Sequence, residues 1–263
     1  MSWKVNYTEK KRPKLDRPVL IEGLPGIGNV GKVAVDFLIE ELKAKKLCSF
    51  FSYTLPHSVF VNESNLIELP TIELFYKKRG NGRPDLLILT GDVQPIEEVS
   101  SYDFCDTLLN LLEQLGIASI VTLGGIGLPS VPKNPNIYCT GNSKKAVDDF
   151  RKNANVKTEL YGIVGPIIGV SGILLGLAGM RKIPAVALLA ETVGNPLYLG
   201  VKGAREIVKA LDSRLMIGVN MKGLDKEIAK MEKEIMKRAE ELLSVTKSTT
   251  GQKLKHGQMS YIG

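Results

Sequence analysis

The sequence predicts an α/β protein in which helices cover both faces of a mainly parallel central sheet, giving three layers. Two observations lead to this prediction. Short apolar runs of strand length alternate with longer segments whose apolar residues recur every three or four positions. The short runs are also apolar throughout, as strands buried on both faces are. With 263 residues, 44% of them hydrophobic, the chain can form a sizeable core in one large domain or two smaller ones.

In the first half of the chain, glycine, asparagine and proline mark the ends of the expected elements. Val19–Ile21 is a short apolar run that stops at Gly23, which is typical of a buried strand. Residues 29–45 then carry apolar side chains at helical spacing. Composition predicts strands at 48–55, 59–61, 66–69, 72–76 and 86–89, and the three between 59 and 76 are expected to be short and antiparallel.

The second half continues the alternation of helix and strand. Apolar residues from Tyr102 to Leu115 form one helical stripe that ends at Gly116, a common helix stop. The next strand, at 117–123, is expected to end at Gly124 and Gly125. Further strands are expected at 137–139, 161–164 and 185–189, and further helices at 143–152, in the glycine-rich segment after 164, and at 201–211.

The C-terminal region is expected to contain an amphipathic helix and a flexible tail. In residues 224–243 apolar side chains recur at steps of three and four, with lysine and glutamate opposite them. This helix either packs on its own domain or mediates oligomerisation. The expected divisions are a flexible basic arm at 1–17, a single α/β domain at 18–243 and a flexible tail at 244–263.

The net charge of +7 first points to nucleic acid or another anionic surface, but its distribution changes that interpretation. Residues 1–18 carry six basic and two acidic side chains, and residues 244–263 carry three basic and no acidic ones. The two ends therefore hold the whole excess, and the body between them is balanced. A balanced body with few, dispersed aromatic residues predicts no basic stripe and no specific nucleic-acid partner.

Cysteine and histidine usage indicates a reducing compartment and no zinc site. Cys48, Cys105 and Cys139 are odd in number and widely spaced, and only two histidines accompany them. The polar N-terminal stretch has no apolar segment of the kind that marks export. We therefore expect a cytoplasmic protein without a bound metal.

Residues 160–180 form a run of 21 residues without a charged side chain, which is long enough to cross a membrane. Its glycines also match the spacing of membrane helix pairs. Gly162, Gly165 and Pro166 interrupt the run early, however, and another apolar strand follows directly. The pattern therefore favours a strand, a turn and a short helix buried against a sheet.

The segment Gly23–Lys32 contains the sharpest local motif. Gly26, Gly28 and Gly31 spell G-x-G-x-x-G between a strand and a helix, as in dinucleotide-binding turns, but the next strand lacks the acidic residue that binds ribose. The same segment is nearly a P-loop ending in Lys32, with Val33 where a hydroxyl should bind magnesium. The alternative is structural, because glycines permit a tight turn and close helix packing.

Two further residues are candidates for chemistry. Asp92 follows a buried strand, where it either serves a catalytic or metal site or accepts hydrogen bonds from backbone groups in a turn. Ser171 lies in a near match to a nucleophile elbow that lacks the final glycine, with His57 as the base available in the body. The simpler role for Ser171 is to cap the helix that follows or to lie in its first turn.

Five strings occur in a fixed order along the chain: Glu22–Gly31, Thr90–Pro95, Thr122–Gly125, Gly169–Ala178 and Ile183–Thr192. Together they resemble the archaeal and bacterial relatives of the proteasome assembly chaperones, over about residues 18–243. The resemblance implies a phosphorylase/hydrolase-like fold, self-association into homo-oligomeric rings or compact oligomers, and binding of proteasome α-subunits without ATP. Because no catalytic constellation is complete, we also expect no cofactor and no catalysis.

The resemblance also draws attention to the C-terminal tail, because some members dock on the proteasome through a terminal hydrophobic-Tyr-any motif. Here the end reads Met259, Ser260, Tyr261, Ile262 and Gly263, with tyrosine third from the end and serine before it. We expect the tail to bind proteasome α-subunits, its own ring or another protein partner. The alternatives are a scaffold for a non-proteasomal partner and an enzyme that binds a nucleotide or phosphate through the glycine turn.

Overall fold

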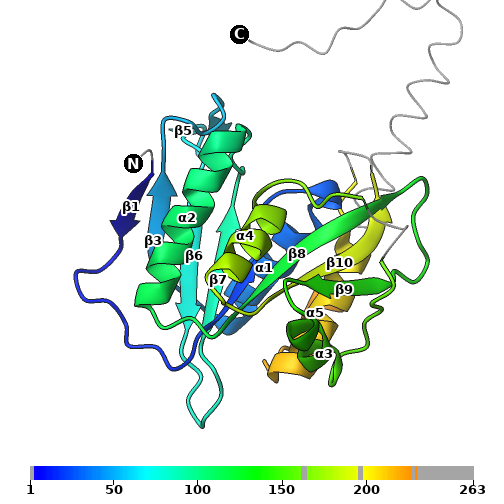
Figure 1. The fold of residues 1–263 in the computed structure, drawn as a ribbon. Coiled ribbons are helices and arrows are strands. Elements are labelled where there is room, and N and C mark those ends of the chain that lie inside the picture. Colours follow the sequence, from blue (N-terminus) through cyan, green and yellow to red (C-terminus); the bar gives the residue numbers. More distant parts are fainter. Residues whose placement is uncertain (1–2, 161–164, 195–197, 227–228, 230–263) are drawn as a thin grey trace, which may run out of the picture. The chain divides into compact units, whose positions relative to one another are not determined.

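The computed structural model describes residues 3–160, 165–194, 198–226 and 229 (Figure 1). The chain divides into two compact units, residues 1–220 and 221–263, instead of the expected single domain at 18–243. The first unit holds the α/β fold, and residues 221–226 of the second are helical. The expected strand at 161–164, most of the expected helix at 224–243 and the tail lie outside the described residues.

An eight-stranded sheet forms the centre of the first unit, in the order β1-β3-β6-β7-β2-β8-β10-β9. The four central strands, β7, β2, β8 and β10, are mutually parallel, and the strands on either side of them are antiparallel. The bounds are β1 Lys4–Tyr7, β2 Val19–Glu22, β3 Lys45–Phe51, β6 Ile72–Lys77, β7 Leu86–Gly91, β8 Ser119–Leu128, β9 Ile137–Gly141 and β10 Ala185–Val193. A separate hairpin joins β4 (Phe60–Val61) to β5 (Ile67–Glu68).

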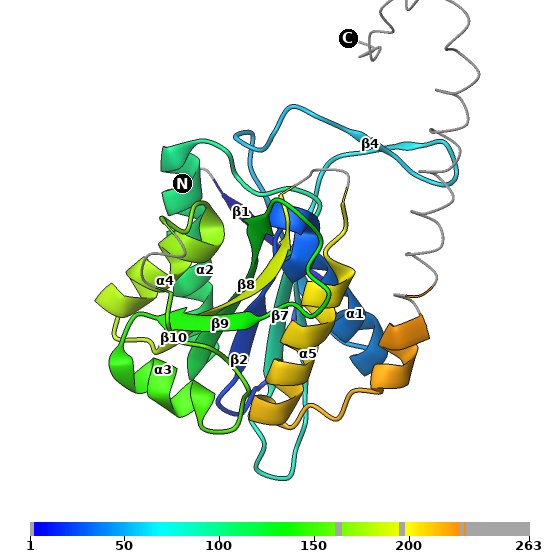
Figure 2. The ribbon, with the colours of Figure 1, turned by 90° about the vertical axis from the view of Figure 1, so that its right-hand side faces the viewer.

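Helices cover both faces of this sheet, so the predicted α/β fold class is confirmed. Helices α2 and α4 pack together on one face, and α1 and α5 pack together on the other, while α3 contacts β9 and β10 (Figures 1 and 2). The helix bounds are α1 Val30–Leu42, α2 Glu98–Gln114, α3 Lys144–Arg151, α4 Val170–Met180 and α5 Val201–Leu215. Every residue of β2 and β7 is buried, as their continuous apolar sequence predicts for strands covered on two sides.

Strand β8 corrects one expected boundary. It does not end at Gly124 and Gly125 but continues to Leu128, paired with β10 as far as Val193. The glycines have another purpose, because a Cβ atom on Gly125 would lie 2.3 Å from the carbonyl oxygen of Ile27. They let the turn after β2 approach the strand closely without ending it.

The N-terminal segment is not the flexible arm that its composition predicts. Lys4–Tyr7 pairs antiparallel with β3 as the edge strand of the sheet. Trp3 is buried, its indole Nε1 donates to the carbonyl oxygen of Ser100 at 3.2 Å, and its ring lies 4.7 Å from that of Phe104. The alternation of Trp3, Val5 and Tyr7 along a polar segment is the pattern of a half-buried edge strand.

Candidate functional site

The glycine turn between β2 and α1 is a close-packed junction. Ile27–Asn29 forms a short 3₁₀ turn, and Gly28 adopts a positive φ of 61°. A Cβ atom on Gly23 would lie 2.3 Å from the carbonyl oxygen of Gly31, and one on Gly31 would lie 2.6 Å from that of Leu123. Only glycine permits this approach of helix, turn and strand.

The two charged residues proposed for ligand binding at this turn, Lys32 and Asp92, both interact with neighbouring groups of the protein. The Lys32 ammonium group lies 2.9 Å from the Asp36 carboxylate, one helical turn further along α1. The Asp92 carboxylate accepts hydrogen bonds from the backbone N–H of Thr71 at 2.9 Å and from its hydroxyl at 2.8 Å. Asp92 thereby joins the end of β7 to the segment that precedes β6.

A cavity of about 550 Å³ lies beside the glycine turn, at the carboxyl ends of β2 and β8. The chain leaves β2 toward α1 and leaves its parallel neighbour β7 toward α2, on opposite faces of the sheet, and open α/β folds place ligands where neighbouring strands diverge in this way. The lining includes Gly26, Gly31, Gly125, Gln94 and Ser171, is otherwise mostly apolar, and holds no acidic or basic side chain among the described residues.

Ser171 contacts a buried carboxyl group in this region. It lies in the first turn of α4, as the simpler interpretation of its motif expects, and its hydroxyl donates to Glu22 Oε2 at 2.9 Å. His57 lies instead in a pocket formed with Tyr53 and Leu69, so the structure does not bring Ser171 and His57 together. The hypothesis that Ser171 and His57 act together as in a serine hydrolase is therefore wrong.

Glu22 is the functional-site candidate that sequence reasoning missed. It is fully buried at the end of β2, and its Oε1 accepts a hydrogen bond from the backbone N–H of Leu24 at 2.9 Å. Burial raises the pKa of this carboxyl group from 4.5 to about 7, against the opposing effect of its bonds from Leu24 and Ser171. An acidic residue closing an all-apolar strand was the available signal.

Cys48, Cys105 and Cys139 are free and buried. Within the described part of the chain, no group of three or more histidine, cysteine, aspartate or glutamate side chains is arranged to hold a metal ion. None of the described helices combines the length and apolarity needed to cross a membrane. The charge-free segment at 160–180 instead supplies α4, which buries Val170 and Leu174 against the sheet.

The β4–β5 hairpin presents an exposed apolar surface. We call residues 59–69 the apolar hairpin, because Val59, Phe60, Val61, Leu66, Ile67 and Leu69 are each between 44% and 71% exposed. Asn62 orders its turn by accepting hydrogen bonds from the backbone N–H groups of Ser64 at 2.9 Å and Leu66 at 3.0 Å. The hairpin projects from the side of the sheet at which the carboxyl end of β7 lies (Figures 1 and 2).

Comparison with known proteins identifies the class of this fold. The model of the PAC2 family matches residues 20–239, so the chain belongs to that family. The structure of this chain is similar to that of Pyrococcus furiosus PbaB, an archaeal proteasome activator, with a TM-score of 0.81 and 31% identity over 91% of this chain and 99% of that one.

Two further proteins are similar along most of their length. Pyrococcus furiosus PbaA, an archaeal homolog of proteasome-assembly chaperone, shares the fold with a TM-score of 0.74 and 22% identity, covering 93% of this chain and 95% of that one. The uncharacterized protein MJ1210 of Methanocaldococcus jannaschii is 29% identical over 237 residues, 89% of each chain. The resemblance to proteasome assembly chaperones is thus confirmed at the level of the family.

Proposed function

We propose that this protein is a cytoplasmic, non-enzymatic assembly factor that works without ATP by binding proteins. Its partners are further copies of itself, in a ring-like homo-oligomer, and proteasome α-subunits. The single observation that favours a protein-binding role is the apolar hairpin, an ordered surface of six exposed apolar side chains. The similarity to PbaB, a proteasome activator, favours the proteasome as the partner.

The apolar hairpin is assigned to self-association. A two-stranded hairpin on its own is marginally stable in water, and within the described part of the chain β4 and β5 pair with each other and not with the main sheet. Contiguous exposed apolar surface on a folded protein marks an interaction site. Contact with a second copy would bury Val61 and Ile67, which pair across the hairpin on one of its faces, and would stabilise the hairpin at the same time.

Light scattering of the full chain at micromolar concentration tests this assignment. We expect a mass that is a multiple of 28.7 kDa, reduced by the double substitution Val61→Ser and Ile67→Ser. Met180→Ser with Met216→Ser is the control, because both methionines are exposed and lie outside the hairpin. A monomeric wild type, or equal masses for the two double variants, would contradict a hairpin interface.

The C-terminal tail, with Met259, Ser260, Tyr261, Ile262 and Gly263, lies outside the described residues, and we propose it as a second contact with protein partners. The test is co-elution with proteasome α-subunits of the full chain and of a chain ending at Ser244. We expect the shortened chain to lose α-subunits. Equal retention by both chains would assign partner binding to the folded body instead.

The alternative of a nucleotide-binding enzyme finds little support. Phosphate groups are held by basic side chains and free N–H groups, whereas the described lining of the cavity has no lysine or arginine and Lys32 is paired with Asp36. Isothermal titration with ATP, NAD and phosphate should give no binding heat that depends on Lys32. A saturable signal that the substitution Lys32→Ala abolishes would favour the enzyme.

A further inference from the structure

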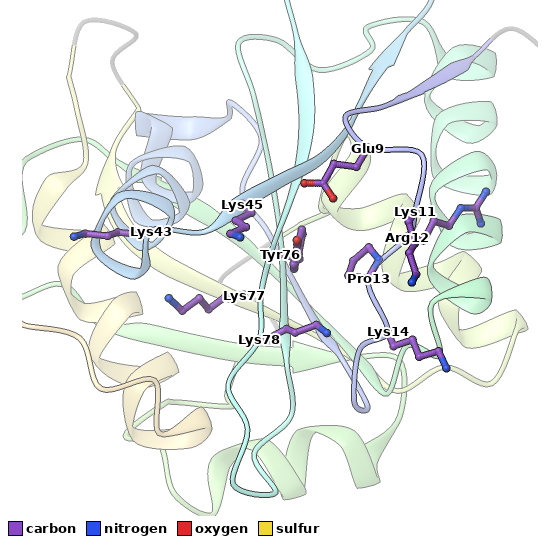
Figure 3. A pocket seen from close by; sticks show the side chains of 10 residues that line it. All are labelled: Glu9, Lys11, Arg12, Pro13, Lys14, Lys43, Lys45, Tyr76, Lys77 and Lys78. Atoms are coloured by element: carbon purple, nitrogen blue, oxygen red, sulfur yellow. The ribbon is translucent and has the colours of Figure 1, made fainter.

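A second concavity, of about 770 Å³, is lined almost entirely by charged side chains (Figure 3). It lies near the amino end of β7, because Lys77 on its wall pairs with Leu86, the first residue of that strand. We call it the basic groove. Its charged lining consists of Lys11, Arg12, Lys14, Lys43, Lys45, Lys77 and Lys78, with Glu9 as the single acidic residue.

The basic groove arises because the N-terminal segment folds back onto the sheet. After β1, the backbone of Asp16 exchanges hydrogen bonds with Asp85, one of them to the Asp85 carboxylate at 2.9 Å. The segment is thereby held at both ends, with Lys11 and Lys14 on one side of Tyr76 and Lys45 on the other (Figure 3). Three of the seven cations come from the N-terminal segment, which carries an excess of positive charge, and the fold places them beside four lysines from the part of the chain whose charges balance along the sequence.

Most of these cations have no acidic partner. Arg12 donates to the side chain of Gln114 at 2.7 Å and lies over the ring of Tyr7, and Lys77 donates to the carbonyl oxygen of Leu42. The other five lysines are Lys11, Lys14, Lys43, Lys45 and Lys78. They are exposed, and none of them forms an ion pair within the described part of the chain. Like charges gathered around one concavity repel each other and favour an anion between them.

We propose that the basic groove binds an acidic segment, rich in aspartate and glutamate, of a protein partner. The inference builds on the proposed protein-binding function and adds a contact separate from the hairpin and the tail. Flexible lysines suit carboxylates at variable positions, whereas a fixed bidentate site would use arginine, and Arg12 is already engaged.

The shape and lining of the groove favour a peptide over a nucleic acid. Single-stranded nucleic acid binds through aromatic side chains on which its bases stack, and Tyr76, half-buried, is the one aromatic residue among the described residues of the lining. A duplex is too wide to enter a concavity of about 770 Å³, so its phosphates could contact only the rim. An extended acidic chain can enter and be contacted from both sides.

Fluorescence anisotropy on the full chain tests the proposal with a labelled peptide of alternating glutamate and serine. The matched neutral peptide replaces each glutamate with glutamine, and oligouridylate and a short DNA duplex are the nucleic-acid arms. We expect binding of the acidic peptide alone, weakened about tenfold by a moderate rise in salt. Tighter binding of either nucleic acid, or no binding of the acidic peptide, would overturn the proposal.

Charge reversal locates the site. The triple substitution Lys43→Glu, Lys45→Glu and Lys78→Glu should weaken peptide binding about tenfold or more, because it replaces attraction with repulsion. The control reverses Lys133, Lys144 and Lys145, which are exposed, lie outside the groove and give the same change in net charge. Equal losses in both variants would refute a localised site.

Two further measurements separate this inference from the proposed function. Circular dichroism melting and light scattering should show that both triple variants fold and keep the wild-type mass. A chain ending at Ser244 should retain peptide binding, since its groove is intact. If the wild type binds α-subunits but not the acidic peptide, the groove proposal fails while the proposed function stands.

Discussion

Replacing Glu22 with glutamine should make the protein more stable at neutral and higher pH. The Glu22 carboxyl group is fully buried, and its pKa rises from 4.5 to about 7 because burial disfavours the charged form. The folded state therefore holds this proton more tightly than the unfolded state. The free energy of unfolding must fall as pH rises from about 4.5 to about 7, and it stays lower above that range.

The size of the effect follows from the two pKa values. At about 1.4 kcal/mol for each pH unit, the difference between 4.5 and about 7 corresponds to about 3 kcal/mol lost by the wild type at pH 8. Glutamine has the same shape and cannot ionise, and its carbonyl can still accept from the N–H of Leu24. The hydroxyl of Ser171 can rotate to accept from the new amide.

Urea unfolding of Glu22→Gln and wild type at fixed protein concentration, from pH 4.5 to pH 8, measures this difference. We expect similar stability at the acid end and a gain for the variant of about 3 kcal/mol at pH 8, equivalent to about 6–12 °C in Tm. Parallel curves across the range, or a variant less stable than wild type at pH 8, would refute the assignment of a buried ionisable carboxyl group.

Glu191→Gln provides the opposite control. Partial burial acts to raise the pKa of Glu191, but hydrogen bonds from Asn136 and Tyr138 outweigh it and hold the pKa below its usual value. A lowered pKa stabilises the folded state above the acid range, and that contribution is lost as pH falls. Glu191→Gln should therefore lose stability at pH 7 and little at low pH, with a slope opposite in sign to that of Glu22→Gln.

Three other substitutions test the packing. Gly31→Ala should destabilise the fold by about 1–3 kcal/mol or more, because its Cβ would lie 2.6 Å from the carbonyl oxygen of Leu123. Gly176→Ala, on α4, should instead stabilise the fold by about 0.5–1 kcal/mol, because no neighbouring group of the described residues lies within 4 Å of the added Cβ. Chemical unfolding measures both changes. Trp3→Ala should cost about 3–5 kcal/mol by removing the contact with Phe104, whereas a melting temperature equal to that of wild type would show that the N-terminal segment contributes nothing.

The parallel centre of the sheet was predictable from local sequence. Val19–Glu22 and Leu86–Gly91 are apolar along almost their whole length because both faces of each strand are covered, and that pattern can be recognised without knowing the neighbouring strands. The turn at Gly26 could be placed for the same reason. Its glycines lie between an apolar run and a helical pattern, whatever else packs on them.

The features that escaped prediction depend on contacts between distant segments. Trp3 is buried by α2, about a hundred positions away, and its alternation with Val5 and Tyr7 is too short to distinguish an edge strand from a loose arm. Glu22 looks like a polar strand end until α4 is known to lie against it. The basic groove joins Lys14 to Lys45 and Lys78, whose charges a count along the chain assigns to different regions.

Binding of proteasome α-subunits without ATP is the core of the proposed function. Sedimentation velocity tests it directly on equimolar, nucleotide-free mixtures of the full chain with α-subunits and, separately, with assembled 20S particles, at micromolar concentration. We expect a new, faster species that contains both proteins and does not change when ATP is added. Unshifted boundaries in both mixtures would rule out this function and would favour a scaffold for a different partner.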